Sequence, residues 1–228
     1  MDKIHLLSKI SIFHELPVEA LQALDSLTLT KHVQKGDVFL SPDDNINTLY
    51  LLKKGQVRLY QLNAVGKQFT VDILGSGNVL SEASALSEQK NFLYAEAMTD
   101  TMLCVLSKHD FKKFMSNHPE VAFQFITLLT KRLNDVYIMS QKIALEDVKY
   151  RILYLLLRFA ESPSDKEWAK IRYRLRHQDI ATMIGATRET VSNTMSQLKK
   201  EHLIKSGMSL YIHTYKVHHL LETRGISS

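Results

Sequence analysis

The hydrophobic pattern changes along the chain, and each change predicts a different kind of element. Within the first 25 residues, apolar positions recur at near-helical spacing, which indicates short helices. From Lys31 to about Phe111 the apolar runs are short, as in "TLYLL", "QVRLY" and "TMLCVL", and turn residues such as Gly55 and Gly66 separate them. Many short strands at this spacing predict a jelly-roll β-barrel.

A long helical pattern follows Pro119 and continues to about Ile143. One heptad frame of this pattern carries Ala122, Phe125, Leu129, Arg132, Val136, Met139 and Ile143, and all of these except Arg132 are apolar. An apolar seam of this length predicts a helix that pairs with a second copy of itself. The alternative, a helix packed on its own barrel, stays open.

The segment after the long helix predicts a second helix, a loop and a strand. The stretch "LEDVKYRILYLLLRFAE" has the spacing of an amphipathic helix, and "SPSDKE" (162–167) is expected to be a loop. In "IRYRLR" (171–176), apolar and arginine residues alternate strictly. This alternation predicts a half-buried strand with a basic outer face.

Charge divides the chain unevenly. The first 144 residues carry 15 Lys or Arg and 15 Asp or Glu, whereas the last 84 carry 14 and 9, so the net charge of +5 lies entirely in the last part. A basic domain beside a neutral one favours a polyanionic partner, although a merely solvated basic surface has the same composition. We therefore expect an α+β protein with a β-roll at 1–117, a dimerisation helix at 118–144 and a basic domain at 145–228.

The stretch "HQDIATMIGATRETVSNTMSQLKKEHLI" predicts a helix-turn-helix. Its first helix has an apolar side made by Ile180, Ala181 and Ile184, and residues 185–187 form a short glycine-containing turn. Thr187 is expected to cap a second helix that buries Val191, Met195 and Leu198. This arrangement leaves the opposite face of the second helix for a DNA groove.

The exposed residues of the second helix have the chemistry of base recognition. Arg188 can donate two hydrogen bonds to guanine, and Glu189 can accept one from cytosine. Ser192, Asn193 and Ser196 are expected to reach bases or phosphates. The expected phosphate contacts are Arg176, His177, Gln178, Thr187 and Lys199.

The segment "LIKSGMSLYIHT" places apolar runs on both sides of Ser206-Gly207, which predicts a β-hairpin wing. Ordinary helix pairs also match short helix-turn-helix patterns, and some winged helices bind proteins. A non-DNA scaffold that binds protein is therefore kept as the alternative function. The basic segment before the two helices and the hairpin after them favour DNA.

With these motifs in place, the chain resembles the Crp/Fnr superfamily of bacterial transcription regulators over nearly its whole length. "KGDVFLSPDDNINTLYLLKKGQVRLY" is similar to the cyclic-nucleotide-binding β-roll, "HPEVAFQFITLLTKRL" to the start of the dimer helix, and Asp147 to the aspartate near the hinge. "IATMIGATRETVSNTMSQLKKEHLI" is similar to the DNA-binding signature. The resemblance implies a homodimer on a pseudo-palindrome whose half-site contains a G·C step like that in TGTGA. Asn193 replaces an arginine of the catabolite activator branch.

The effector pocket departs from the pattern of that family. Ser81 stands at the glycine position before Glu82, and Phe92, Leu93 and Tyr94 replace the Arg, Ser/Thr and Ala that hold the cyclic phosphate. Val136 and Tyr137 stand where cAMP-binding members present hydroxyls to adenine. Phenylalanine cannot replace a charge-assisted arginine–phosphate contact. We expect no tight cAMP binding and leave open an unidentified effector or a pocket filled by the residues at 92–94.

No other cofactor is expected. An iron–sulfur cluster needs several cysteines, whereas Cys104 is the only one and lies in an apolar run that predicts a buried thiol. A redox role for Cys104 is a minor alternative, and no His/Cys pattern marks a haem site. A cupin-type metalloenzyme is the least favoured reading, because the five histidines of residues 1–144 are scattered. No metal site and no enzymatic activity are expected.

These observations together predict a sequence-specific DNA-binding transcription regulator. Its expected partners are double-stranded DNA, a second copy of the chain and, for an activator, RNA polymerase. Because the sequence has neither a signal-peptide pattern nor an apolar run of about 18 residues, we expect a cytoplasmic protein without membrane contact.

Overall fold

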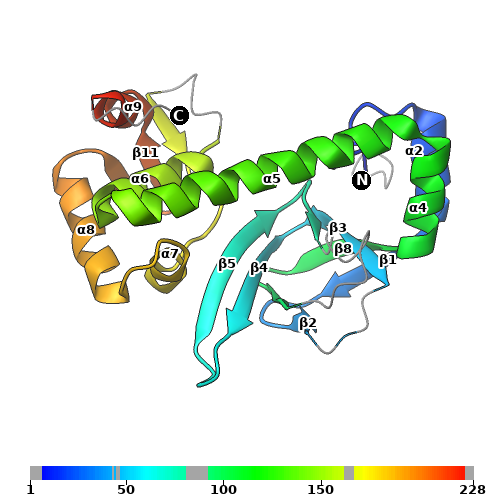
Figure 1. Ribbon diagram of the computed structural model, residues 1–228, viewed down its shortest axis with the longest axis horizontal. Helices are drawn as coiled ribbons and strands as arrows, with labels where there is room; N and C mark the ends of the chain where they lie inside the picture. Colours follow the sequence, from blue (N-terminus) through cyan, green and yellow to red (C-terminus); the bar gives the residue numbers. More distant parts are fainter. Residues whose placement is uncertain (1–6, 43, 45–46, 81–91, 162–166, 224–228) are drawn as a thin grey trace. The chain divides into compact units, whose positions relative to one another are not determined.

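The computed structural model describes residues 7–42, 44, 47–80, 92–161 and 167–223. The chain divides into two compact units, residues 1–134 and 135–228. The boundary falls within α5 (Pro119–Leu145), which is a single unbroken helix of 27 residues (Figure 1). The α+β fold class is as predicted, and the expected domain limits at residues 117 and 144 remain a proposal.

The first unit is a β-roll made of two four-stranded antiparallel sheets. In spatial order, one sheet contains β1 (Thr28–Val33), β8 (Thr101–Ser107), β3 (Thr48–Lys54) and β6 (Val79–Leu80). The other contains β2 (Val38–Leu40), β7 (Tyr94–Ala97), β4 (Gln56–Leu62) and β5 (Gln68–Gly75). One apolar cluster joins Leu52 and Leu103 of the first sheet to Leu59 and Ala95 of the second, so the interior of the roll lies between them.

Helices form a second apolar cluster with the first sheet. α2 (Val18–Ser26), α4 (Lys108–Asn117) and the start of α5 contribute to it (Figure 1). Phe111 of α4 and Phe125 of α5 make an edge-to-face contact at 5.2 Å between ring centroids. Cys104 of β8 is fully buried in this cluster, as the sequence predicted.

Part of the expected dimer seam makes contacts inside the chain, and the pairing of this helix with a second copy stays a prediction. Phe125 is 1% exposed, Leu129 packs on the same cluster, and Arg132 Nη2 donates to the carbonyl oxygen of Val79 at 2.9 Å. Met139 likewise packs against the core of the second unit. A heptad pattern marks an apolar face but does not distinguish the chain's own core from a partner. The exposed apolar positions of α5 include Phe123, Ile126, Leu133, Val136, Tyr137, Ile143 and Leu145.

The second unit joins helices to a three-stranded sheet. It contains α6 (Val148–Arg158), β9 (Trp168–Lys170), α7 (His177–Met183), α8 (Arg188–Lys200), β10 (Ile204–Ser206), β11 (Leu210–His213) and α9 (Thr214–Glu222). The sheet order is β10-β11-β9, and β10 and β11 form the expected hairpin. One buried cluster contains Leu156 of α6, Ile180 of α7, Val191 of α8 and Ile212 of β11. The helices and the hairpin therefore share one core.

The predicted strand at 171–176 is not present, and this expectation was wrong. The strand lies earlier, at Trp168–Lys170, and Ile171 makes only an isolated bridge with Ala160. The side chains nevertheless alternate as expected, since Ile171 is buried while Arg172 and Arg174 are exposed. Alternation thus identified the inward side chains, but a strand also needs a neighbouring strand to complete its backbone hydrogen bonds.

Among the described residues, none of the helices has the length and apolar character needed to cross a membrane. That part of the chain also holds no group of three or more His, Cys, Asp or Glu side chains placed to bind a metal ion.

Candidate nucleic-acid interface

The first helix of the site, α7, begins at a paired arginine and aspartate. Arg176 precedes the helix, and its Nε and Nη2 donate to the two carboxylate oxygens of Asp179 at 2.8 and 3.0 Å. Asp179 is fully buried, whereas the Arg176 side chain is half exposed. Because both nitrogens bind one carboxylate, the guanidinium has a fixed orientation at the helix start. His177 is half-buried and Gln178 exposed in the same turn.

The turn between the helices is closed by backbone geometry and by an arginine that sequence analysis missed. Gly185 has a φ of 67°, a left-handed conformation that favours glycine. The N–H of Ala186 donates to the carbonyl oxygen of Ala181 at 2.8 Å. Arg151 of α6 donates from Nη1 to the carbonyl oxygen of Ile184 at 3.2 Å and from Nε to that of Glu146 at 2.7 Å. A cation at the end of a helix satisfies carbonyl groups that the helix leaves open.

The second helix, α8, has the cap and the buried face that the sequence predicted. Thr187 Oγ1 accepts a hydrogen bond from the N–H of Thr190 at 3.1 Å, which makes Thr187 the N-cap. Val191, Met195 and Leu198 are buried in the core of the second unit. These contacts fix the rotation of α8 about its axis, so most of its remaining side chains are exposed.

The exposed face of α8 carries the residues expected to recognise bases. Arg188, Glu189 and Asn193 are exposed, and Ser192 is half-buried. Ser196 is exposed, and its Oγ donates to the carbonyl oxygen of Ser192 at 3.0 Å, which leaves its oxygen available as an acceptor. Lys199 is exposed in the last turn. The geometry therefore combines donors, acceptors and a cation on one helix face.

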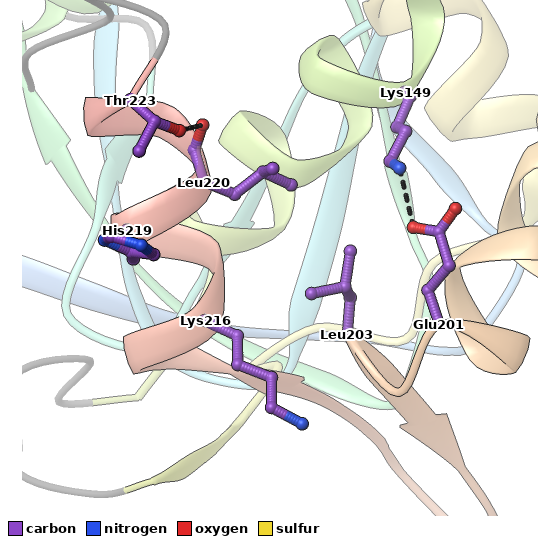
Figure 2. A pocket seen from close by; sticks show the side chains of 7 residues that line it. All are labelled: Lys149, Glu201, Leu203, Lys216, His219, Leu220 and Thr223. Atoms are coloured by element: carbon purple, nitrogen blue, oxygen red, sulfur yellow. Dashed lines mark hydrogen bonds and ion pairs between the residues drawn. The ribbon is translucent and has the colours of Figure 1, made fainter.

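A shallow groove lies beside the C-terminal end of α8 (Figure 2). Its volume is about 410 Å³, and it is lined by Lys149, Glu201, Leu203, Lys216, His219, Leu220 and Thr223. Lys149 Nζ and Glu201 Oε2 form an ion pair at 2.6 Å across one side of it. The hydrogen bond from Lys149 lowers the pKa of Glu201, although partial burial acts in the opposite direction. This pair joins the start of α6 to the end of α8.

Of the expected effector residues, the structure describes those at 92–94 in the first unit and Val136 and Tyr137 in the second. Ser81 and Glu82 lie outside the described residues. Phe92 is 66% exposed, and Leu93 packs toward the interior cluster. Tyr94 alternates with the inward-facing Ala95 and stacks on Tyr60 at 5.1 Å, so it lies on the other face of the sheet. The residues at 92–94 therefore do not jointly fill the interior. On α5, Val136 and Tyr137 are both exposed.

A polar cluster that sequence analysis did not predict lies on the face of the β2-β7-β4-β5 sheet that carries Tyr60 and Tyr94. Arg58 of β4 pairs with Glu96 of β7, donates to Gln68 Oε1 at 2.6 Å, and lies 4.6 Å from the Tyr60 ring centroid. Burial raises the pKa of Tyr60, the Glu96 charge raises it further, and Arg58 lowers it. Arg58 and Glu96 are register partners on adjacent strands that are far apart in sequence. Only the strand pairing brings their charges together.

Comparison with known proteins identifies the class of each unit. Residues 30–118 match the family model of the cyclic nucleotide-binding domain, and residues 150–220 match that of the Crp-like helix-turn-helix domain. The protein therefore combines a β-roll of the cyclic nucleotide-binding family with a helix-turn-helix domain of the Crp-like family, which is the domain arrangement of a transcription regulator.

Individual relatives agree with this class. The chain is 30% identical over 176 residues to the global nitrogen regulator of Synechococcus elongatus, covering 75% of this chain and 79% of that protein. It is 28% identical over 196 residues to the cyclic AMP receptor protein of Thermus thermophilus, covering 86% and 88%. The crystal structure of the Thermus thermophilus catabolite activator protein superposes with a TM-score of 0.54 at 25% identity, covering 95% of this chain and 100% of that one.

The chain belongs to the Crp/Fnr family of transcriptional regulators. It is a transcription regulator with a helix-turn-helix, and not an enzyme. The cupin-type alternative is thereby set aside.

Proposed function

We propose that the protein is a cytoplasmic homodimer that binds a pseudo-palindromic DNA site, with one α8 helix in the major groove of each half-site. The observation that carries this proposal is that α8 buries one face in the core and exposes polar and charged side chains elsewhere. Val191, Met195 and Leu198 fix the helix in the core, while Arg188 and Glu189 of its first turn are exposed. Recognition helices contact bases mainly through their N-terminal residues.

The proposed base contacts follow from the donors and acceptors of these side chains. Arg188 donates to O6 and N7 of guanine, and Glu189 accepts from N4 of cytosine. Ser192, Asn193 and Ser196 lie further along the same face, where hydroxyl and amide groups reach bases or phosphates. Together they favour a half-site with a G·C step, and Asn193 sets the neighbouring position.

The proposed phosphate contacts lie at both helix starts and at the end of α8. Thr187 caps the positive end of the α8 dipole, and Arg176 is held by Asp179 at the start of α7. His177, Gln178 and Lys199 complete the set, since each is exposed or half-buried. These contacts position the domain on the duplex and carry little sequence information.

The proposed dimer contact uses the exposed apolar stripe of α5. Phe123, Ile126, Leu133 and Tyr137 are all exposed and follow a heptad spacing. A large exposed apolar patch is typical of an interaction surface. Two copies joined along this stripe would form a two-fold dimer, and helix-turn-helix dimers bind half-sites about 34–36 Å apart.

We further propose that this regulator does not depend on cAMP. The Thermus relative is named for cyclic AMP, but here Phe92 and Leu93 stand where the family pattern has a phosphate-binding arginine and a hydroxyl residue. Two modes of control fit: abundance of a constitutive binder, or a different ligand that shifts the population toward the DNA-binding state. A micromolar or tighter cAMP complex by calorimetry would contradict this proposal.

Selection of bound DNA tests the whole proposal. Ligand-free protein is mixed with a randomised palindrome pool, and binding is followed by fluorescence anisotropy at two salt concentrations. Enrichment of one two-fold site supports the regulator and a competent ligand-free state. Weak binding with no enriched sequence and a steep salt dependence indicates a state that awaits a ligand.

The double variant Arg188→Ala/Glu189→Ala separates the regulator from the alternative, a protein-binding scaffold. Loss of sequence-specific binding by an intact dimer supports base recognition. Unchanged binding supports the scaffold. Recruitment of RNA polymerase is proposed only for the case in which the site activates transcription.

A further inference from the structure

The tip of the β10–β11 hairpin exposes a single large apolar side chain. Met208 is 107% exposed, more than any other large hydrophobic residue in the described part of the chain. Ser206 pairs with Leu210 at the end of the ladder, and the N–H of Gly207 donates to the carbonyl oxygen of Ser209 at 3.1 Å. A hydrogen-bonded turn therefore holds Met208 away from the protein.

The hairpin is rigidly joined to α8. Ile204 and Ile212 are buried in the cluster that also contains Val191 and Leu198 of α8. The N–H of Leu203 donates to the carbonyl oxygen of Leu198 at 3.0 Å. The position of the tip relative to α8 is thus fixed before any DNA is bound.

The surroundings of Met208 are compatible with a polyanion. Residues 203–213 include no Asp or Glu. Lys205 Nζ lies 4.2 Å from the Trp168 ring centroid and 5.3 Å from that of Tyr211, which holds its positive charge against the hairpin. The hydroxyl residues Ser206 and Ser209 flank the tip. The exposed apolar group therefore lies between hydroxyl groups in a hairpin without Asp or Glu, and Glu167 pairs with His213 at the far end of β11 from the tip.

We propose that Met208 enters the minor groove beside the segment read by α8 and acts there as an apolar wedge against sugars and base edges. This inference rests on the proposed function. A helix in the major groove is flanked by phosphates and then by the minor groove, so a hairpin fixed beside α8 meets those elements. Proteins that insert Met or other apolar side chains at a minor-groove step unstack it partly and bend the duplex. Flexible steps such as TA and CA are therefore preferred there.

Three substitutions at one position test the wedge on the selected DNA site. Met208→Ala removes the side chain, Met208→Gln keeps its length but makes it polar, and Met208→Leu keeps it apolar. Tyr215→Ala is the matched control, because Tyr215 is 59% exposed on α9. Affinity is measured by anisotropy on duplexes that differ only in the step flanking each half-site, and bending by energy transfer between dyes at the duplex ends.

We expect the Ala and Gln variants to bind about three- to tenfold more weakly, to lose the preference for TA or CA steps, and to bend DNA less. The Leu variant and the Tyr215 control should behave like the wild type. Wild-type affinity, step preference and bending in the Ala and Gln variants would overturn the inference. If that occurs while Arg188→Ala still abolishes the site preference, only the wedge fails. If Arg188→Ala also leaves the site preference unchanged, the proposed function fails with it.

Discussion

Arg151 Nη1 lies 3.2 Å from the carbonyl oxygen of Ile184, so a residue of α6 binds the end of α7, 33 positions away in sequence. The same guanidinium also donates to the carbonyl oxygen of Glu146, before α6 begins. One side chain thus connects the segment that follows α5 to the turn of the helix-turn-helix. The orientation of α8 depends on this turn, because the turn sets the direction in which α8 starts.

Replacing Arg151 with Met keeps the apolar stem but removes both hydrogen bonds. We expect the free energy of unfolding of the second unit to fall by about 1–3 kcal/mol, because two carbonyl acceptors lose a charged donor. Urea unfolding followed by the fluorescence of Trp168, the only tryptophan, measures this directly. Lys170→Met, which removes an exposed cation of β9, is the comparison. An Arg151→Met protein as stable as the wild type would contradict the assigned role.

His202 adopts a φ of 55° directly after the last residues of α8, a position where glycine is usual. We expect His202→Gly to raise the free energy of unfolding by about 0.5–1 kcal/mol, because the left-handed conformation is strained for residues with a Cβ. His202→Val should lower it, since β-branched residues tolerate this conformation least. Thermal unfolding of both variants and the wild type checks that stability decreases in the order Gly, His, Val at position 202.

The ion pair between Lys149 and Glu201 predicts a pH dependence of stability. The pKa of Glu201 is lowered in the folded protein, so its stabilising effect is fully present above the unfolded pKa of about 4.3 and is lost as the pH falls through the lower folded value. Below pH about 4.3, we therefore expect the free energy of unfolding to fall less steeply with decreasing pH in Glu201→Gln than in the wild type. Denaturant midpoints at neutral and acidic pH compare the two proteins. Parallel pH curves would exclude a contribution from this pair.

The exposed stripe of α5 predicts which substitutions separate the dimer. Leu133→Glu places a charge in the proposed seam, and we expect it to produce monomers at micromolar concentration, because an unpaired charge is expensive to bury. Lys131→Glu is the matched control, since Lys131 is exposed two positions away on another face of the helix. Sedimentation velocity measures both. A Leu133→Glu dimer that dissociates no more than the control would exclude this seam.

Base and phosphate contacts should respond differently to substitution. Arg188→Ala is expected to lose about 1–3 kcal/mol at a single base-pair position, whereas Lys199→Ala should weaken binding to all sequences and reduce the salt slope by about one. Titrations of site variants at several salt concentrations distinguish the two patterns. A uniform loss for Arg188→Ala would assign Arg188 to a phosphate instead of a base.

The parts of the molecule that could be predicted from sequence are those specified by local periodicity. The spacing of Val191, Met195 and Leu198 was sufficient to predict the buried face of α8. Local spacing was insufficient where a second segment decides the outcome. Phe125 lies at a heptad position, but its neighbour Phe111 lies in another helix of the same chain. The pair of Arg58 and Glu96 depends in the same way on the register of two distant strands.

The burial of Cys104 has a practical consequence. Its thiol is fully enclosed by the apolar cluster of the first unit, so a thiol reagent can reach it only when that cluster opens. The rate of its chemical labelling therefore reports opening of the first unit, while the fluorescence of Trp168 reports on the second. The wild-type chain thus carries one natural probe in each unit, and the two can be followed separately without introducing a label.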